Sequence, residues 1–162
     1  AENAGVIAGT LAGGTAEGCL GLNSEKEYFV YEFWNDRFVG KIAGDKPLVE
    51  TLRPGESRML SLHEVSGHPQ FIATDRHVMQ GYVDLADVEW SSERSVLSGT
   101  SQVVVDDPYT VTIATGDQMP LGVELDDSNS RAVIEKVGSQ LVKIRITSGA
   151  NVTVRWSVKF RK

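Results

Sequence analysis

Histidines and the acids beside them are the first residues in this chain whose types suit catalysis or metal binding. The run from His63 to His68, with Glu64 second, is close to the H-E-x-x-H signature of zinc proteases, which sets two imidazoles one helical turn apart. Here one extra residue separates the two histidines, and Gly67 and Pro69 disfavour a helix. The spacing therefore argues against a zinc-protease motif.

The same histidines allow other interpretations. A loose metal site would use His63, His68 and His77, and ordinary hydrogen bonds at strand ends are the alternative. Asp75-Arg76-His77 has the residue types of a charge relay, but the chain has no G-x-S-x-G turn to present a nucleophile. On a strand, Asp75 and His77 share one face and Arg76 points to the other. We therefore expect His68, Asp75, Arg76 and His77 to form a structural polar cluster at the junction of two lobes.

Paired carboxylates occur at Asp106-Asp107 and Asp126-Asp127. Glycoside hydrolysis needs two carboxyl groups about 5–10 Å apart across a cleft. Adjacent aspartates beside Pro108 or Ser128-Asn129 are better explained as turn formers, with a calcium-binding loop as the alternative. The glycine-rich run Ala8–Thr15 lacks the lysine of a phosphate-binding loop. The sequence thus predicts no catalytic residue, metal or cofactor.

Aromatic side chains are the candidates for binding carbohydrate, because a flat ring packs on the apolar face of a sugar. The candidates are Tyr31, Trp34, Tyr82, Trp90 and Tyr109. Trp34 stands where an apolar strand gives way to a polar turn, so we expect it to be partly exposed. For any single one of these rings, burial in a core is the competing interpretation. Trp156 is expected in the core, because it lies on the apolar face of an alternating strand.

Composition limits the functional classes. The chain has 162 residues and a formal net charge of -6, which gives little support for binding nucleic acid. No apolar run approaches the roughly 20 residues of a membrane span. The single cysteine, Cys19, cannot form an internal disulfide and is expected to be a small buried residue. The start of the chain is rich in Gly and Ala and has no basic segment, so we do not expect a signal peptide there.

Strand patterns fill almost the whole chain. Apolar and polar residues alternate through Val142–Ile146 and Val152–Phe160, and the turn between them predicts a hairpin. Turn signals recur roughly every 8–12 residues, as in sandwiches and barrels. A boundary near Gln80-Gly81 separates two series of strands. We therefore predict an all-β fold of two packed antiparallel β-sandwich lobes, residues 1–80 and 81–162, or one large sandwich.

Basic side chains collect on the polar face of the predicted last hairpin. They are Lys143, Arg145, Arg155, Lys159 and Arg161. Like charges facing each other across strands are destabilising. Acids of neighbouring strands, such as Glu89, Glu124 and Glu135, or of a preceding domain would offset them. The alternative is a site for acidic glycans.

Several blocks resemble the C-terminal region of bacterial α-galactosidase-like (melibiase-type) glycoside hydrolases. In chain order they are Tyr28–Trp34, Phe38–Gly40, Leu52–Leu60, His68–Gly81, Trp90, Leu97–Ser101 and Asp107–Tyr109. The block HPQFIATDRHVMQG, residues 68–81, is the most specific, and the resemblance spans about residues 28–113. Beyond it the chain is covered only by its strand pattern.

In that family the catalytic aspartates lie in a preceding (β/α)₈ barrel, and nothing in this chain matches the barrel. The resemblance therefore implies a non-catalytic accessory β-sandwich domain that packs on a catalytic barrel and stabilises it. A second hypothesis is a carbohydrate-binding module that uses Trp34, Trp90, Tyr82 or Tyr31, and the third is an independent hydrolase. From the charge and the lack of a long apolar run we expect no nucleic-acid or membrane partner, and the sequence leaves the bacterial compartment open among periplasm, extracellular space and cytoplasm.

Overall fold

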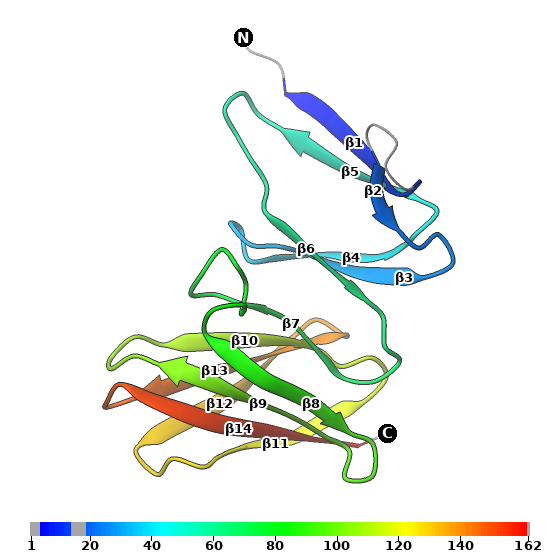
Figure 1. Cartoon of the computed structure of the whole chain (residues 1–162). Coiled ribbons are helices and arrows are strands. Elements are labelled where there is room, and N and C mark those ends of the chain that lie inside the picture. The colour runs from blue at the N-terminus through cyan, green and yellow to red at the C-terminus, as the bar shows by residue number, and fades with distance from the viewer. Residues whose placement is uncertain (1–3, 14–18, 162) are drawn as a thin grey trace. The chain divides into compact units, whose positions relative to one another are not determined.

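The computed structural model describes residues 4–13 and 19–161, and all regular elements among them are strands (Figure 1). The predicted all-β fold is thus confirmed, with four sheets in sandwich-like layers. Gly14 and Thr15 of the glycine-rich run lie outside the described residues. In the described part of the chain, no helix is long and apolar enough to cross a membrane.

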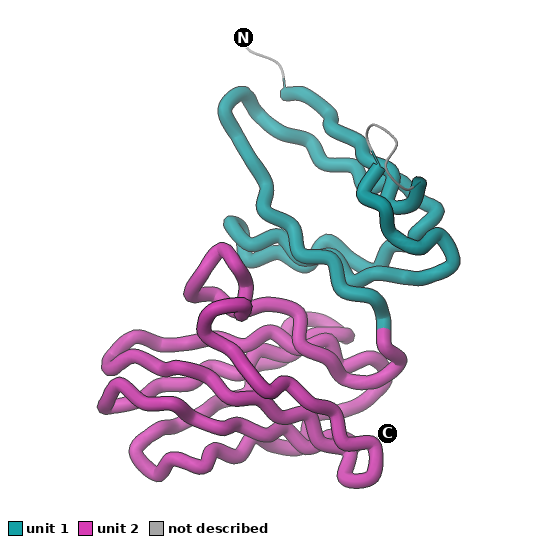
Figure 2. The backbone as a smooth tube through the Cα atoms, in the orientation of Figure 1, with its two compact units in different colours: residues 1–65 teal, residues 66–162 magenta. Residues whose placement is uncertain are grey.

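The chain divides into two compact units, Ala1–Val65 and Ser66–Lys162 (Figure 2). The division lies earlier than the boundary expected near Gln80-Gly81. The reason is that β7 (Gln70–Thr74) pairs with β10 (Tyr109–Ala114). This pairing makes the His68–Gly81 block part of the second unit.

The first unit consists of two three-stranded sheets. Its strands are β1 (Gly5–Ala12), β2 (Cys19–Leu22), β3 (Glu27–Glu32), β4 (Arg37–Ala43), β5 (Pro47–Leu52) and β6 (Leu60–Glu64). The sheet orders are β2-β1-β5 and β4-β3-β6. Strands β1 and β2 pair in parallel, a departure from the expected antiparallel pattern. Tyr28 and Val30, two residues apart on β3, pack with Leu11 and Leu48 of the other sheet in a small core.

The second unit is an eight-stranded sandwich. The strands after β7 are β8 (Leu85–Ser91), β9 (Val96–Val103), β10, β11 (Met119–Leu125), β12 (Ser130–Val137), β13 (Leu141–Ser148) and β14 (Val152–Arg161). One sheet has the order β12-β13-β10-β7 and the other β11-β14-β9-β8. All residues of β10 are buried, because β7 and β13 flank this strand in its sheet and the second sheet covers it.

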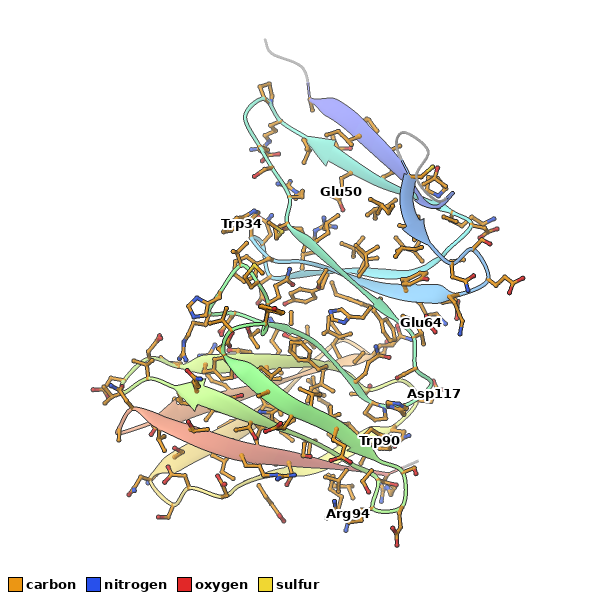
Figure 3. All side chains as sticks on the ribbon, in the orientation of Figure 1. Trp34, Glu50, Glu64, Trp90, Arg94 and Asp117 are labelled. Atoms are coloured by element: carbon orange, nitrogen blue, oxygen red, sulfur yellow. The ribbon has the colours of Figure 1, made fainter. Side chains whose placement is uncertain are left out.

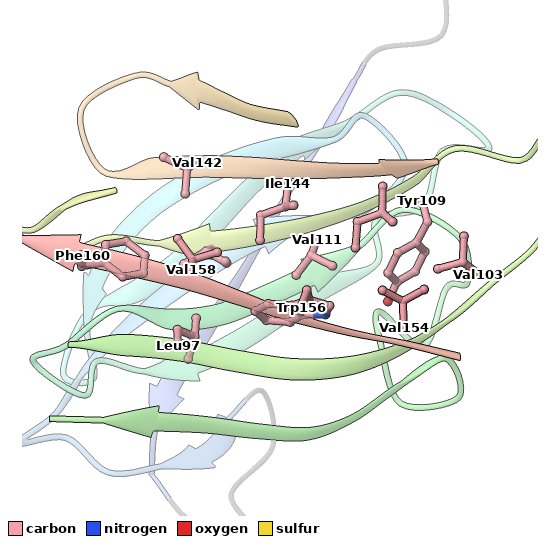
Figure 4. Packing of buried hydrophobic residues seen from close by; sticks show 12 residues of the cluster. Leu97, Val103, Tyr109, Val111, Val142, Ile144, Val154, Trp156, Val158 and Phe160 are labelled. Atoms are coloured by element: carbon pink, nitrogen blue, oxygen red, sulfur yellow. The ribbon is translucent and has the colours of Figure 1, made fainter. Parts of the chain in front are cut away.

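The core of the sandwich centres on β14 (Figure 4). Val154, Trp156 and Val158 are fully buried and face Val111 and Ile144 of the opposite sheet (Figure 4). The indole Nε1 of Trp156 donates a 3.0 Å hydrogen bond to the hydroxyl of Ser101. The prediction that Trp156 is a core residue is confirmed.

The predicted hairpin of the last two strands is wrong. Strand β13 belongs to the β12-β13-β10-β7 sheet and β14 to the facing sheet, so residues 149–151 cross between layers. Asn151 holds this crossing, because its side-chain oxygen accepts the backbone N–H of Val105 at 2.9 Å. The basic face expected there is consequently split between opposite outer surfaces of the sandwich. Lys143 and Arg145 lie on one sheet, and Arg155, Lys159 and Arg161 lie on the other.

Candidate functional site

The aromatic candidates of the first unit are Tyr31, on strand β3, and Trp34, in the turn between β3 and β4. Trp34 is 56% exposed, and its ring packs edge-on against Phe33 with centroids 5.2 Å apart (Figure 3 labels Trp34). Tyr31 is only 3% exposed, and its hydroxyl donates to the carboxylate of Asp36. Trp34 therefore has a free surface for a ligand, whereas Tyr31 does not.

The aromatic candidates of the second unit differ in exposure. Tyr82 is 83% exposed, in the segment before β8. Trp90 is half-buried on β8, where the His68 ring stacks on it at 5.4 Å and the Phe160 ring meets it edge-on at 6.0 Å. Tyr109 is fully buried. Only Tyr82 presents most of its ring to solvent.

The residues of the expected polar cluster, His68, Asp75, Arg76 and His77, do not share common partners. Asp75 accepts the backbone N–H of Thr110 at 2.8 Å, which fastens the end of β7 to β10. Arg76 donates to Asp107 and to the carbonyl of Gln102, at 3.2 and 2.6 Å. His77 is exposed, and His68 contacts Trp90.

Asp75 and Arg76 thus position the chain after β7 against β10 and the preceding loop. His68 and His77 contact other residues. All of these residues are in the second unit.

A cluster of polar groups around the buried Tyr109 was not anticipated from the sequence. The Arg76 guanidinium lies 4.8 Å from the centre of the Tyr109 ring, a cation–π geometry. Burial raises the pKa of the Tyr109 hydroxyl well above its ordinary value, and the neighbouring Asp84 carboxylate raises it further. Ser101 and Arg76 lower this pKa, but burial is the largest influence. Asp84, itself only 4% exposed, gives no sequence signal because its neighbours come from distant strands.

The raised pKa predicts that the folded protein becomes less stable in alkali, where burial of the Tyr109 hydroxyl opposes loss of its proton. The unfolded chain releases the phenol proton near pH 10, whereas the folded protein retains it. The stabilisation is therefore complete below about pH 10 and falls as the pH rises above that value. We expect the urea midpoint of the wild type to drop more between about pH 8 and about pH 11 than that of Tyr109→Phe. The exposed Tyr82→Phe variant is the matched control and should behave as the wild type, and equal drops in all three would contradict the assignment.

The acidic pairs lie at turns, where their side chains form hydrogen bonds and an ion pair. Asp126 accepts the backbone N–H of Arg155 at 2.8 Å, and Asp127 accepts the hydroxyl of Ser130 at 2.5 Å. Asp107 binds Arg76, and Asp106 has a left-handed φ of 55° in the turn between β9 and β10. The turn prediction for these four residues is confirmed.

The zinc-protease pattern is also absent from the geometry. His63 and Glu64 end strand β6 rather than lying on a helix, and Glu64 pairs with Lys26 at 2.8 Å (Figure 3 labels Glu64). Among residues 4–13 and 19–161, no three His, Cys, Asp or Glu side chains are placed to hold a metal ion. The described residues offer no arrangement that corresponds to the zinc or charge-relay motifs.

An exposed apolar sheet distinguishes the first unit. On the outer face of β2-β1-β5, Val6 is 68% and Val49 is 52% exposed. Ala8 lies between them, directly opposite Val49 in the strand register. Exposed apolar side chains that adjoin one another on one surface mark interaction sites more often than isolated ones do.

The inner face of the same sheet is open as well. A groove of about 430 Å³ runs between it and β6, and apolar side chains supply most of its lining. They include Ile7, Leu20, Leu52, Met59, Leu60 and Leu62. Ile7 and Leu20 remain more than half exposed, at 59% and 52%. The small core of this unit therefore leaves apolar surface uncovered on both faces of one sheet.

A second groove crosses the outer face of the β11-β14-β9-β8 sheet. Its volume is about 660 Å³, within the range of ligand sites. Charged side chains border it: Glu93 and Arg94 from the β8–β9 turn, Glu124 from β11 and Lys159 from β14. Figure 3 labels Arg94 at this turn. None of the aromatic candidates lines this groove.

Comparison with known protein families, with curated proteins and with solved structures found no match.

Proposed function

We propose that this chain is a non-catalytic accessory domain of an α-galactosidase-like glycoside hydrolase, packing on a (β/α)₈ catalytic domain and stabilising it. The resemblance of residues 28–113 to the C-terminal region of such enzymes supports this role. The observation that carries the proposal is the apolar surface on both faces of the β2-β1-β5 sheet. A partner domain that covered Val6 and Val49 on the outer face would remove their apolar surface from water, which is favourable.

The test combines the purified chain with a catalytic barrel of this enzyme class that lacks its own C-terminal region. We expect a complex that raises the unfolding temperature of the barrel, because binding to the native state stabilises it. The chain alone is expected not to hydrolyse an aryl α-galactoside. Turnover by the chain alone would contradict the accessory role, as would the absence of a complex with barrels of this class.

Charge placed on the apolar sheet is expected to abolish docking. The double variant Val6→Asp/Val49→Asp should weaken the complex by at least about tenfold, because two carboxylates would be desolvated in the interface. Isothermal calorimetry measures the affinity, and circular dichroism checks that the strands remain.

Val133→Asp is the matched control for this substitution. Val133 lies on β12 of the second unit and is 59% exposed, so the same change occurs at a similar exposure away from the sheet. Equal weakening by the control would show that added charge alone, and not the β2-β1-β5 face, is responsible.

Carbohydrate binding by aromatic rings is the second candidate. The observation that favours it is the exposure of Trp34 and Tyr82, at 56% and 83%. Each is the only one of the five aromatic candidates with a largely free ring in its unit, so any sugar would stack on a single platform. A single ring gives limited affinity, and the docking role is therefore the primary proposal.

A further inference from the structure

The groove on the outer face of the β11-β14-β9-β8 sheet owes its shape to small residues. Strand pairing places Gly122 and Val96 on either side of Lys159, and Ser98 and Glu124 on either side of Ser157. Because Gly122 has no side chain, and Ser157 a short one, the centre of this face is hollow. The β8–β9 turn and Leu121 of β11 supply the walls.

Charges of both signs border the groove. Within the described part of the chain, Glu93, Glu124 and Lys159 form no ion pair and no side-chain hydrogen bond. Arg94 contacts only the hydroxyl of Ser91, at 3.4 Å. Four charged groups thus remain available to a ligand in the groove.

The balance of these charges limits the ligand class. Two carboxylates and two cations give the groove no net charge, so it offers no net electrostatic attraction to an anionic ligand such as a uronic-acid or sulfated glycan, or to a cationic one. A neutral, hydroxyl-rich ligand satisfies both kinds of group, since carboxylates accept hydroxyl protons while ammonium and guanidinium groups donate to hydroxyl oxygens. Val96, which lies opposite Lys159 on the groove face, adds apolar surface that suits the C–H face of a sugar ring.

We propose that this groove binds a neutral oligosaccharide through Glu93, Arg94, Glu124 and Lys159. The inference goes beyond the docking role and does not rest on it, because the proposed docking sheet belongs to the first unit and the groove to the second. The proposal also places glycan binding away from Trp34 and Tyr82. It predicts a neutral glycan, where the basic side chains of the sequence had suggested an acidic one.

The test is a two-dimensional NMR titration of the isotope-labelled chain with neutral tetrasaccharides, namely stachyose, cellotetraose and xylotetraose, and with tetragalacturonate as the anionic comparison. We expect at least one neutral ligand to shift the backbone amides of the residues lining the groove on β9, β11 and β14. Tetragalacturonate should bind more weakly. Shifts confined to the neighbourhood of Trp34 or Tyr82, stronger binding of tetragalacturonate, or no response to any neutral ligand would each overturn the proposal.

Substitutions distinguish specific binding in the groove from nonspecific binding elsewhere on the surface. Glu124→Gln and Lys159→Met should each weaken binding by roughly tenfold, because each removes charge-assisted hydrogen bonds to the sugar. Glu135→Gln and Arg145→Met are matched controls, since both residues are exposed on the outer face of the opposite sheet. Unchanged affinity in the groove variants, or equal losses in the controls, would contradict the assignment. Barrel docking is measured separately, so failure of either proposal is recognised independently of the other.

Discussion

Trp156→Ala is expected to lower the free energy of unfolding of the second unit by about 3–5 kcal/mol, the usual cost of truncating a fully buried tryptophan. Trp156 is 0% exposed at the centre of the sandwich core, and the change also removes the donor to Ser101. A loss of this size is comparable with the whole stability of many small domains. Hydrogen exchange measured by mass spectrometry should therefore show loss of protection across residues 96–160, and urea unfolding gives the free energy.

Two variants control this experiment. Trp90→Ala truncates the same residue type at a half-buried position and should cost clearly less. Trp156→Phe keeps most of the apolar volume but loses the indole N–H, so we expect an intermediate cost. If Trp156→Ala were no more destabilising than Trp90→Ala, the core would not be centred on β14.

The fit of the Trp156 ring depends on a glycine in the neighbouring strand. A Cβ added at Gly99, which lies directly opposite Trp156 on β9, would come within 2.5 Å of the indole ring. The glycine is needed so that the ring can lie over the neighbouring strand. The Leu97–Ser101 block therefore contains a packing requirement that the sequence does not reveal by periodicity.

Strand positions were predictable because they depend on local alternation. The alternation through Val152–Phe160 arises because one face of the strand is buried, at Val154, Trp156, Val158 and Phe160. Strands β8 and β9 likewise pair as a local hairpin, since the turn around Ser91–Ser95 returns the chain to the same sheet. Such features are set by neighbours in sequence.

Strand partners were not predictable in the same way. Residues 149–151 have the composition of a hairpin turn, yet they carry the chain from one sheet to the other. A turn that crosses between layers and a turn within one layer both require polar, conformationally permissive residues, so composition does not separate them. The pairing of β7 with β10, which moved the division of the chain, likewise depends on contacts between distant segments.

For the candidate sites too, local sequence predicted some features and only the fold revealed the others. The position of Trp34 before a polar turn predicted its partial exposure, but only the fold could show that Tyr82 is exposed and Tyr31 buried. The groove escaped prediction because its shape comes from the small side chains at Gly122 and Ser157, and no residue of obvious chemistry marks them. Its charged residues come from three separate segments of the chain and converge only when β11, β14 and β9 form one sheet.

Glu32→Ala is expected to destabilise the first unit by about 3 kcal/mol, because the charge-assisted hydrogen bonds that a buried carboxylate accepts from the β3–β4 turn are lost together. Glu32 is a fully buried carboxylate at the end of β3. It accepts the backbone N–H groups of Trp34 and Asn35 at 2.9 and 3.1 Å, and the side-chain amide of Asn35 at 2.5 Å. Loss of hydrogen-exchange protection should be concentrated in residues 27–43, and thermal unfolding gives the total loss.

Glu27→Ala is the matched control, because Glu27 begins the same strand but makes an exposed ion pair with Lys41 at 2.9 Å. An exposed pair contributes about 0–1 kcal/mol, so this variant should unfold close to the wild type. The difference arises from burial of the carboxylate: the fully buried Glu32 accepts three hydrogen bonds that Ala cannot replace, whereas without Glu27 the Lys41 ammonium is simply hydrated. Equal effects of the two substitutions would mean that the turn presenting Trp34 is held by its backbone alone.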